Sequence, residues 1–188
     1  MGDRRAHVVG FDDAPFHRDD PAPVLVVGAV HAGSRLDGVI STHVSVDGDD
    51  ATAALAECVN TSRFATHLQA ILLQGIAVAG FNVVDVVALH GATGLPVVAV
   101  ARRRPRYLAI ARALYRRVPG GREKWVRLRR VGPMRPVAEL WVQAAGYDAV
   151  EAAALIEHHR RHSRIPEPVR VAHLIASGVS ARASRQRV

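Results

Sequence analysis

The stretch QAILLQGIAVAGFNVVDVVALHGATGLPVVAVARRRP (residues 69–105) contains the pattern that sets the fold class of this chain. It begins with a short apolar run over 69–73, and a second apolar run over 96–101 ends abruptly at an arginine cluster. A helix is predicted between them, over 82–94, because its last residue is a glycine and glycine commonly ends helices. Two continuously apolar strands joined by a helix are typical of a parallel pair inside a sheet covered on both faces.

The segments around this stretch predict a sheet that begins with antiparallel strands. Three runs rich in β-branched residues are separated by short connections, which favours a meander. The elements predicted outside the opening stretch are strands over 6–11, 24–31 and 36–46, a helix over 49–64, a helix over 106–117, a hairpin or strand pair around 124–130 and 139–146, a helix over 148–162 and a last helix that starts near the prolines of 164–178. Three meandering strands followed by alternating helices and strands are the order of an RNase H-like α/β domain with a mixed sheet, although several α/β folds begin with a hairpin.

Length and composition exclude several classes of protein. A chain of 188 residues is enough for one domain, which we place at 1–178, followed by a flexible basic tail at 179–188. No apolar run approaches the roughly 20 residues of a membrane span, and the N-terminus lacks a secretory leader, so we expect no membrane association and a cytoplasmic location. The single Cys58 excludes a disulfide framework and a multi-cysteine zinc site, and its place in a helical pattern predicts a small buried hydrophobe.

Charge is distributed unevenly along the chain. The net charge is +8, and of the basic residues only Lys124 is not an arginine. Residues 1–94 carry five Arg against eleven acids, whereas residues 95–188 carry nineteen Arg and one Lys against six acids. The codon bias of a GC-rich genome or a solvated basic surface would explain the excess, and so would a basic half that binds phosphate beside an acidic half that binds metal.

Carboxylates stand where two predicted strands end. Asp12 and Asp13 follow the first strand, and Asp47 comes last on the third. One reading of Asp12 and Asp13 is a turn or cap before Pro15; the other is a metal site, because a buried carboxylate needs a partner. Carboxylates on neighbouring strand ends give the oxygen ligands that Mg²⁺ or Mn²⁺ prefers, and such an ion can activate water for attack on a phosphodiester.

Basic and imidazole groups supply further candidates. Arg102 lies at the carboxyl end of the second parallel strand, where α/β sheets often contact ligands, and Arg102, Arg103 and Arg104 together form a candidate nucleic-acid-binding run. A solvated strand end is the alternative for Arg102, and a partly buried structural residue is the alternative for His173 in the last helix. The remaining histidines considered are predicted to lie on an exposed helix surface: His158, His159 and His162.

Five segments of the chain resemble the endonuclease dU family, a mostly archaeal group, and more distantly endonuclease V. The resemblance spans 6–177, and its segments are GFDDAPF, LDGVISTHVSVDGDDAT, LLQGIAVAGFNVVDVVALHGATGLPVVAVARRRP, WVQAAG and RIPEPVRVAHLIAS. It implies a metal-dependent endonuclease that acts on nucleic acid containing deaminated bases, deoxyuridine or hypoxanthine, in DNA repair. DNA is favoured over RNA as the partner.

The resemblance also implies roles for individual residues. Asp12 becomes the first-strand ligand of Mg²⁺ or Mn²⁺, Asp47 a third-strand ligand, His173 the last-helix member of the metal site and Arg102 the counterpart of a catalytic lysine. Gln74 stands where the family has an acid, so a neutral amide oxygen replaces a carboxylate and metal affinity should fall. We therefore expect the side chains of Asp12, Asp47, Gln74 and His173 to face one cleft.

Two departures from the family pattern leave alternatives open. The Pro-Tyr-Ile-Pro wedge that endonuclease V inserts at a lesion is absent from GVISTHVSVDG. With Gln74 in place of the acid, the rival hypothesis is a nucleic-acid-binding relative without catalytic activity. A small-molecule hydrolase on the same scaffold is the third hypothesis, and the charge asymmetry argues against it.

Overall fold

A seven-stranded mixed sheet forms the centre of the computed structural model, which describes residues 7–181. Its strand order is β3-β2-β1-β4-β7-β9-β8, and a separate two-stranded sheet pairs β5 with β6. The strands are β1 (His7–Asp13), β2 (Val24–Ala32), β3 (Arg35–Val44), β4 (Ala70–Gln74), β5 (Ala77–Val78), β6 (Asn82–Val83), β7 (Val97–Ala101), β8 (Arg135–Val137) and β9 (Leu140–Ala145). The helices are α1 (Ala51–Asn60), α2 (Val86–Thr93), α3 (Tyr107–Arg117), α4 (Gly121–Arg130), α5 (Ala149–His159) and α6 (Glu167–Ala181).

Strand directions confirm the predicted mixed sheet. β1, β2 and β3 form an antiparallel meander, and β4 pairs in parallel with both β1 and β7. β9 then pairs antiparallel with β7, and β8 with β9. The opening stretch therefore supplies the central strand β4 and its parallel neighbour β7, as its apolar runs predict.

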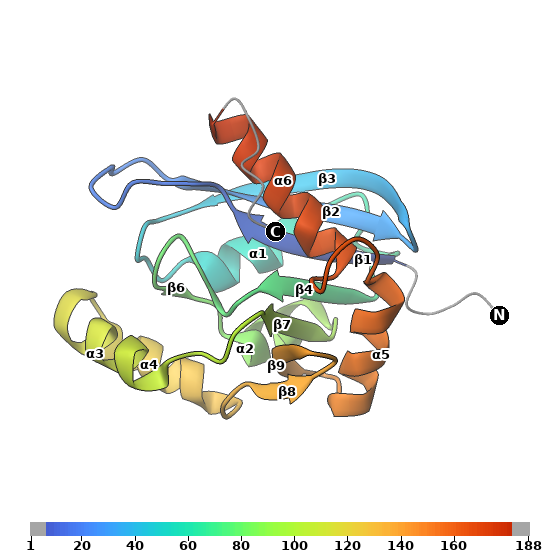
Figure 1. Ribbon diagram of the computed structural model, residues 1–188. Coiled ribbons are helices and arrows are strands. Elements are labelled where there is room, and N and C mark those ends of the chain that lie inside the picture. Colours follow the sequence, from blue (N-terminus) through green and yellow to red (C-terminus); the bar gives the residue numbers. More distant parts are fainter. Residues whose placement is uncertain (1–6, 182–188) are drawn as a thin grey trace.

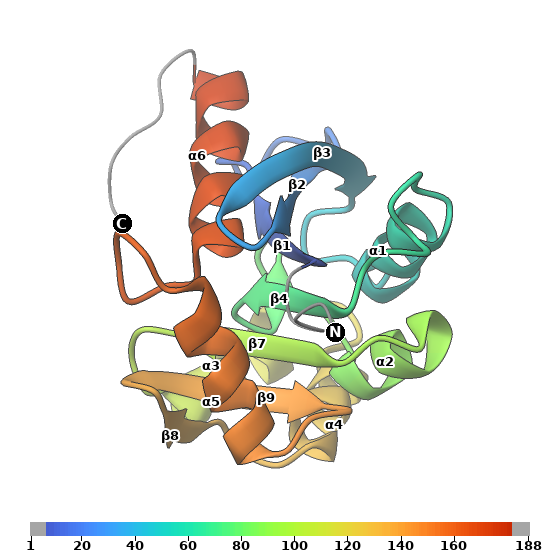
Figure 2. The same ribbon diagram turned by 90° about the vertical axis from the view of Figure 1, so that its right-hand side faces the viewer.

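Helices cover both faces of the sheet. Figure 2 shows α5 and α6 on one face and α1 and α2 on the other, with the sheet seen between them. Alternate residues of a central strand serve the two faces: Ile71 and Leu73 belong to the core beneath α1 and α2, whereas Ala70 and Leu72 belong to the core beneath α5 and α6. Both sets are buried, which explains why the strand is apolar without alternation.

The segment KWVRLRR is a helix, so the prediction of a strand around 124–130 is wrong. α4 buries Gly121, Lys124 and Leu128, which recur at helical spacing, and the strand pair lies further on as β8 and β9. The apparent alternation misled because Lys124 points into the protein, at 1 % exposure, instead of into solvent.

The helix predicted over 82–94 begins at Val86 in the structure, four residues after its predicted start. Residues 82–83 form β6, and α2 begins after Asp85, whose carboxylate accepts hydrogen bonds from the backbone N–H groups of Val87 and Ala88. The predicted end is confirmed, since Gly94 caps the helix with φ 69°.

Smaller predictions had mixed outcomes. His159 is buried, so its assignment to the surface is wrong, whereas His162 is exposed as predicted.

Cys58 is half-buried against the core, and burial raises the pKa of its thiol to about 11. α6 continues through 179–181, and the rest of the predicted tail lies outside the described residues. Within residues 7–181 there is no helix long and apolar enough to cross a membrane.

Candidate functional site

The site is built where three neighbouring strands end. Phe11 lies level with Leu73 across the β1–β4 pair, and Gln74 lies level with Val100 across the β4–β7 pair. Because these strands are parallel, the residues at and just after their carboxyl ends meet at one edge of the sheet. This register brings Asp12, Gln74 and Arg102 to the same edge.

α6 adds His173 to this edge. The helix packs along β1, where Gly10 is required because a Cβ atom there would come within 2.4 Å of the Pro168 backbone. The close approach places His173 Nδ1 2.7 Å from Asp12 Oδ2. The hydrogen bond to Asp12 raises the pKa of His173, against smaller opposing effects of burial and of the nearby Arg102.

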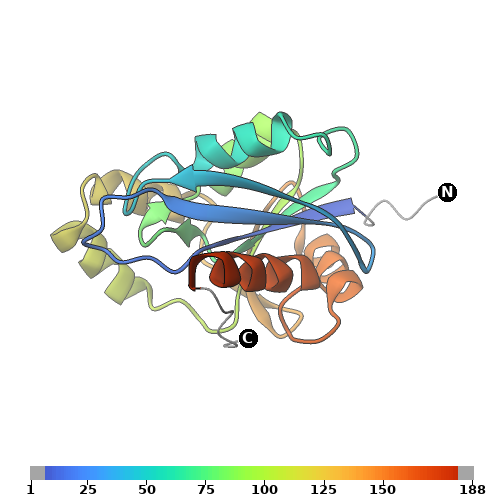
Figure 3. The same ribbon diagram turned by 90° about the horizontal axis from the view of Figure 1, so that it is seen from above.

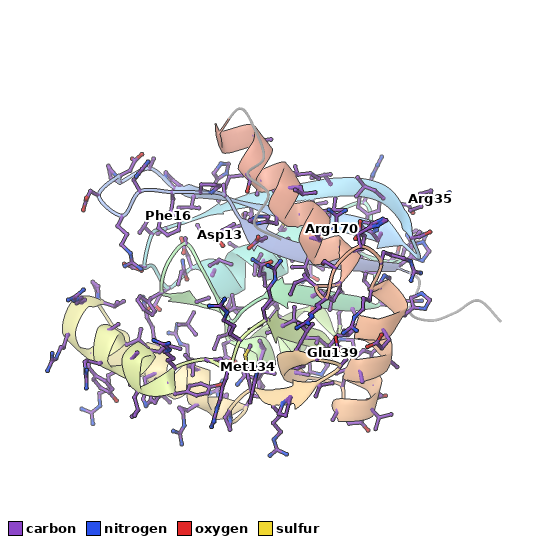
Figure 4. The ribbon with its side chains drawn as sticks, in the orientation of Figure 1. Asp13, Phe16, Arg35, Met134, Glu139 and Arg170 are labelled. Carbon is purple, nitrogen blue, oxygen red and sulfur yellow. The ribbon has the colours of Figure 1, made fainter. Side chains whose placement is uncertain are left out.

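Two adjoining pockets hold these side chains. One, of about 350 Å³, is lined by Asp12, Asp13, Ala14, Pro15, Phe16, Gln74, His173 and Ser177. The other, of about 250 Å³, is lined by Gln74, Gly75, Val100, Ala101, Arg102 and Ile165. Gln74 belongs to both, so the structure brings Asp12, Gln74 and His173 together, with Arg102 beside them. Figure 4 labels Asp13 and Phe16 at this end of the sheet.

Asp13 contributes a second carboxylate to the pocket. Its Oδ2 atom accepts a hydrogen bond of 3.0 Å from the backbone N–H of Ala79. Burial, and secondarily the neighbouring Asp12, raise the pKa of Asp13 from 3.8 to about 6. Two adjacent carboxylates in a sheltered pocket repel each other, and a bound cation would relieve that repulsion.

Asp47 does not line this pocket, so the prediction that it faces the same cleft as Asp12 is wrong. β3 ends at Val44, and Asp47 lies in the following turn with φ 51°. Its carboxylate accepts hydrogen bonds from the Arg18 guanidinium at 2.7 Å and from the Phe81 backbone N–H at 2.6 Å. Arg18 also stacks over the Phe81 ring, 5.4 Å from its centroid. Asp47 thus anchors the β1–β2 loop, which carries Phe16 to the pocket.

The turn around Asp47 is held from below by Lys124. The ammonium group donates hydrogen bonds to the backbone carbonyls of Asp47 and Gly48. The Asp47 backbone N–H donates to the Ala79 carbonyl, and Ala79 in turn donates to Asp13. The one lysine of the chain is therefore part of the scaffold behind the pocket and not of a basic surface.

The arginine run after β7 is exposed. Arg102 lines the second pocket, while Arg104 stacks over the Trp141 ring, 5.5 Å from its centroid. Arg103 is exposed beside them. This placement suits contact with a phosphate backbone outside the pocket.

Two further pocket residues were not predicted from the sequence. Ser177 stands four residues after His173 on α6 and so shares its face of the helix, a spacing that could have predicted it. Phe16 follows β1 in a turn-prone segment, and nothing in the local pattern indicated that the segment folds against the pocket.

The donor groups suit a hard cation with few protein ligands. No cluster of three or more His, Cys, Asp or Glu side chains is arranged to hold a metal ion within residues 7–181. The pocket instead offers two carboxylates, Asp12 and Asp13, and the amide oxygen of Gln74. Mg²⁺ often binds through one or two carboxylates and completes its coordination with water and substrate phosphate, so these residues fit it.

Comparison with known proteins places the chain in a family and a fold. The family model described as endonuclease dU matches residues 4–180. A UPF0215 protein of Deinococcus radiodurans is 51% identical over 177 residues, covering 94% of this chain and 90% of that protein.

Solved structures of other proteins share the fold of this chain. The crystal structure of a protein of unknown function from Archaeoglobus fulgidus is similar with a TM-score of 0.86 and 32% identity, over 92% of this chain and 97% of that one. Endonuclease V of Ciona intestinalis, in complex with a 24mer DNA containing an inosine followed by a ribo-adenosine, is similar with a TM-score of 0.61 and 14% identity, over 94% of this chain and 86% of that one. The predicted RNase H-like fold is thereby confirmed.

Proposed function

The chain belongs to the endonuclease dU family, and from this premise we propose that it is a divalent-metal-dependent endonuclease acting on nucleic acid that contains deaminated bases. The observation that carries the proposal is the meeting of Asp12, Asp13, Gln74 and His173 in one pocket, with Arg102 in the adjoining one. Family membership and the endonuclease V fold support a nuclease, and the donor groups support Mg²⁺ or Mn²⁺ as the cofactor.

Asp12 and Asp13 would hold the metal ion, with the Gln74 amide oxygen as a neutral third donor. When bound, such an ion supplies charge neutralisation at the phosphodiester and lowers the pKa of a coordinated water. Asp12 is 4 % exposed, so its carboxylate is already desolvated and loses little hydration on binding a cation.

His173 would exchange the proton of the reaction. Its Nδ1 atom faces Asp12, and this hydrogen bond holds the ring in one orientation. Nε2 is then the atom that takes a proton from the attacking water or gives a proton to the departing oxygen. The raised pKa of His173 favours the protonated ring, which suits donation to the departing oxygen.

Arg102 would pair with the phosphate next to the scissile bond. Arg103 and Arg104 would pair with the adjacent phosphates of the same strand. A guanidinium keeps its charge at every physiological pH and binds phosphate oxygens in a bidentate manner. Arg102 is exposed, so a nucleic-acid strand that is too large to enter the pocket can still lie across the edge of the sheet and reach it.

Deoxyuridine or hypoxanthine in DNA is the proposed lesion, and the role is DNA repair. The family description supports deoxyuridine, and the inosine-containing DNA bound by Ciona endonuclease V supports hypoxanthine. DNA in preference to RNA is part of the proposal. A single domain over 1–178 and a cytoplasmic location also stay proposals.

One observation favours a second candidate function, a nucleic-acid-binding relative without catalytic activity. Gln74 supplies no charge, and the pocket offers two carboxylates instead of three. The two functions differ in whether the bound strand is cut.

A nicking assay separates them. Duplexes with one uracil, one hypoxanthine or no modified base would be incubated with Mg²⁺ or Mn²⁺ and resolved on a denaturing gel. We expect nicks in a modified duplex, none with EDTA, and none with the Asp12→Ala variant. The matched control is Asp37→Ala, a carboxylate that bonds Arg35 on β3 and lines neither pocket. Binding without cutting under every condition would establish the second function, and equal cutting by Asp12→Ala would place the chemistry elsewhere.

A further inference from the structure

Helices α3 and α4 concentrate positive charge beyond the needs of the pocket. From Arg102 to Arg130 the chain carries eleven Arg and one Lys against a single acid, Glu123. The two helices pack on each other and project together beyond the end of the sheet, at the left of Figures 1 and 3. We call residues 102–130 the basic arm. It begins at Arg102, so it leads directly away from the candidate site.

Most of this charge is not used within the protein. Arg127 pairs with Asp49 and Arg130 with Asp85, both at 2.8 Å. The other arginines of the basic arm have no carboxylate partner among the described residues: Arg102, Arg103, Arg104, Arg106, Arg112, Arg116, Arg117, Arg122 and Arg129. Packing so many like charges together costs free energy in the free protein, and a polyanion would offset that cost.

Apolar side chains are interleaved with these arginines on α3. Leu108, Arg112, Tyr115 and Arg116 recur at helical spacing and form one exposed stripe, in which Leu108 is 87% exposed and Tyr115 58%. A groove of about 540 Å³ at the foot of the stripe is lined by residues 104–108. Exposed apolar groups among unpaired cations match a nucleic-acid strand, which offers sugars and base faces between its phosphates.

Codon bias does not account for this distribution. A GC-rich genome would scatter arginine over all exposed helices, yet α5 contains none and carries Glu151 and Glu157. The basic arm is also almost free of acids, which a preference for arginine codons leaves unexplained.

We propose that the basic arm binds the phosphate backbone of the nucleic-acid strand that flanks the scissile phosphate, with Tyr115 and Leu108 against its sugars and bases. The inference rests on the proposed function for the position of the cut and names the surface that holds the rest of the substrate. α3 has 11 residues and is about 16 Å long, close to half a helical turn of B-DNA. The strand would run from Arg102 through the groove and along the stripe.

The test measures binding in the absence of cleavage. Asp12→Asn protein in EDTA would be titrated into fluorescent unmodified duplex and single-stranded DNA, and anisotropy followed from 50 to 400 mM salt. The basic-arm variant is Arg112→Gln with Arg116→Gln. The control is Arg35→Gln with Arg63→Gln, which removes the same charge near the distal β2–β3 turn, where Figure 4 labels Arg35 far from the arm. Thermal melting of both variants would verify that they fold.

Two lost phosphate contacts should lower the salt slope of binding by about 1.8 and the affinity at 0.1 M salt by about tenfold or more, and the control should change neither appreciably. Tyr115→Ala should weaken single-strand binding about fivefold or more, because stacking on each base is lost.

Equal losses of DNA-binding affinity in the arm variant and the control would mean that only net charge matters, and this would overturn the inference. Unchanged binding by a folded arm variant would overturn it as well. Arm-dependent binding by a protein that nicks nothing would uphold the basic arm as a binding surface while the catalytic proposal fails. Nicking with arm-independent binding would leave the catalytic proposal standing and refute the basic arm.

Discussion

Asp13→Asn should stabilise the metal-free protein at neutral and alkaline pH. Burial and the neighbouring Asp12 raise the pKa of Asp13 from 3.8 to about 6 in the folded state. The unfolded chain releases this proton near pH 3.8, whereas the folded protein holds it to about pH 6. The folded state is therefore penalised progressively as the pH rises through that window, and the penalty is absent below it.

The size of the effect follows from the two pKa values. At 1.36 kcal/mol per unit, a difference of about two units gives a penalty of about 3 kcal/mol above pH 6. Asparagine has nearly the same shape and no charge, and its oxygen can still accept the hydrogen bond that Ala79 donates to Asp13. We expect the variant to gain about 2–3 kcal/mol at pH 8 in EDTA, or a rise of roughly 5–10 °C in Tm, and almost nothing at pH 3.5.

Urea unfolding of both proteins across this pH range is the measurement. Asp37→Asn is the control, because the hydrogen bond from Arg35 lowers the pKa of Asp37 and its removal should bring no gain. Added Mg²⁺ should narrow the gap at pH 8, since the wild type keeps the carboxylate that binds the ion. A gain that does not vary with pH, or no gain at pH 8, would refute the view of Asp13 as an electrostatically strained carboxylate.

Three further variants test the architecture around the pocket. Gln74→Asp should raise Mn²⁺ affinity in calorimetry, because a hard cation gains a carboxylate at the strand end; unchanged affinity would remove Gln74 from the metal site. Lys124→Met leaves two partly buried carbonyl groups without their donor and should cost about 1–3 kcal/mol in urea unfolding, whereas a loss below about 0.5 kcal/mol would mean that water replaces the ammonium. Arg18→Gln breaks the ion pair with Asp47 and should speed hydrogen exchange in residues 14–23 while changing global stability by less than about 1 kcal/mol, and unaltered exchange would show that the loop needs no anchor.

The elements predicted correctly are those whose signals are local. The apolar run of β4 and the left-handed glycine that ends α2 act through neighbouring residues, so the sequence pattern is sufficient. The parallel pairing of β4 with β7 follows because a helix joins them, which brings the second strand back in the same direction.

The errors arose where a distant contact decides the conformation. KWVRLRR alternates like a strand, but it forms a helix. The helix places the Lys124 ammonium group against backbone carbonyls in the turn after β3, 76 and 77 residues away in sequence. Asp47 has the residue type of a metal ligand, yet its carboxylate is taken by Arg18 and the Phe81 backbone. The same residue types could serve either purpose, and only packing distinguishes them.

By itself the sequence determined that carboxylates, an amide and an arginine stand at the carboxyl ends of β1, β4 and β7, because the apolar residues of each strand stop there. Tertiary structure alone decided which of these groups share a pocket. The register of β1 against β4 sets Phe11 level with Leu73, so that Asp12 and Gln74 come next at the same edge of the sheet. The close packing of α6 on Gly10 brings His173, 161 residues away in sequence, to within a hydrogen bond of Asp12. The physical reason is that a residue's chemistry is local, whereas its partners are set by the burial of apolar surface over the whole sheet.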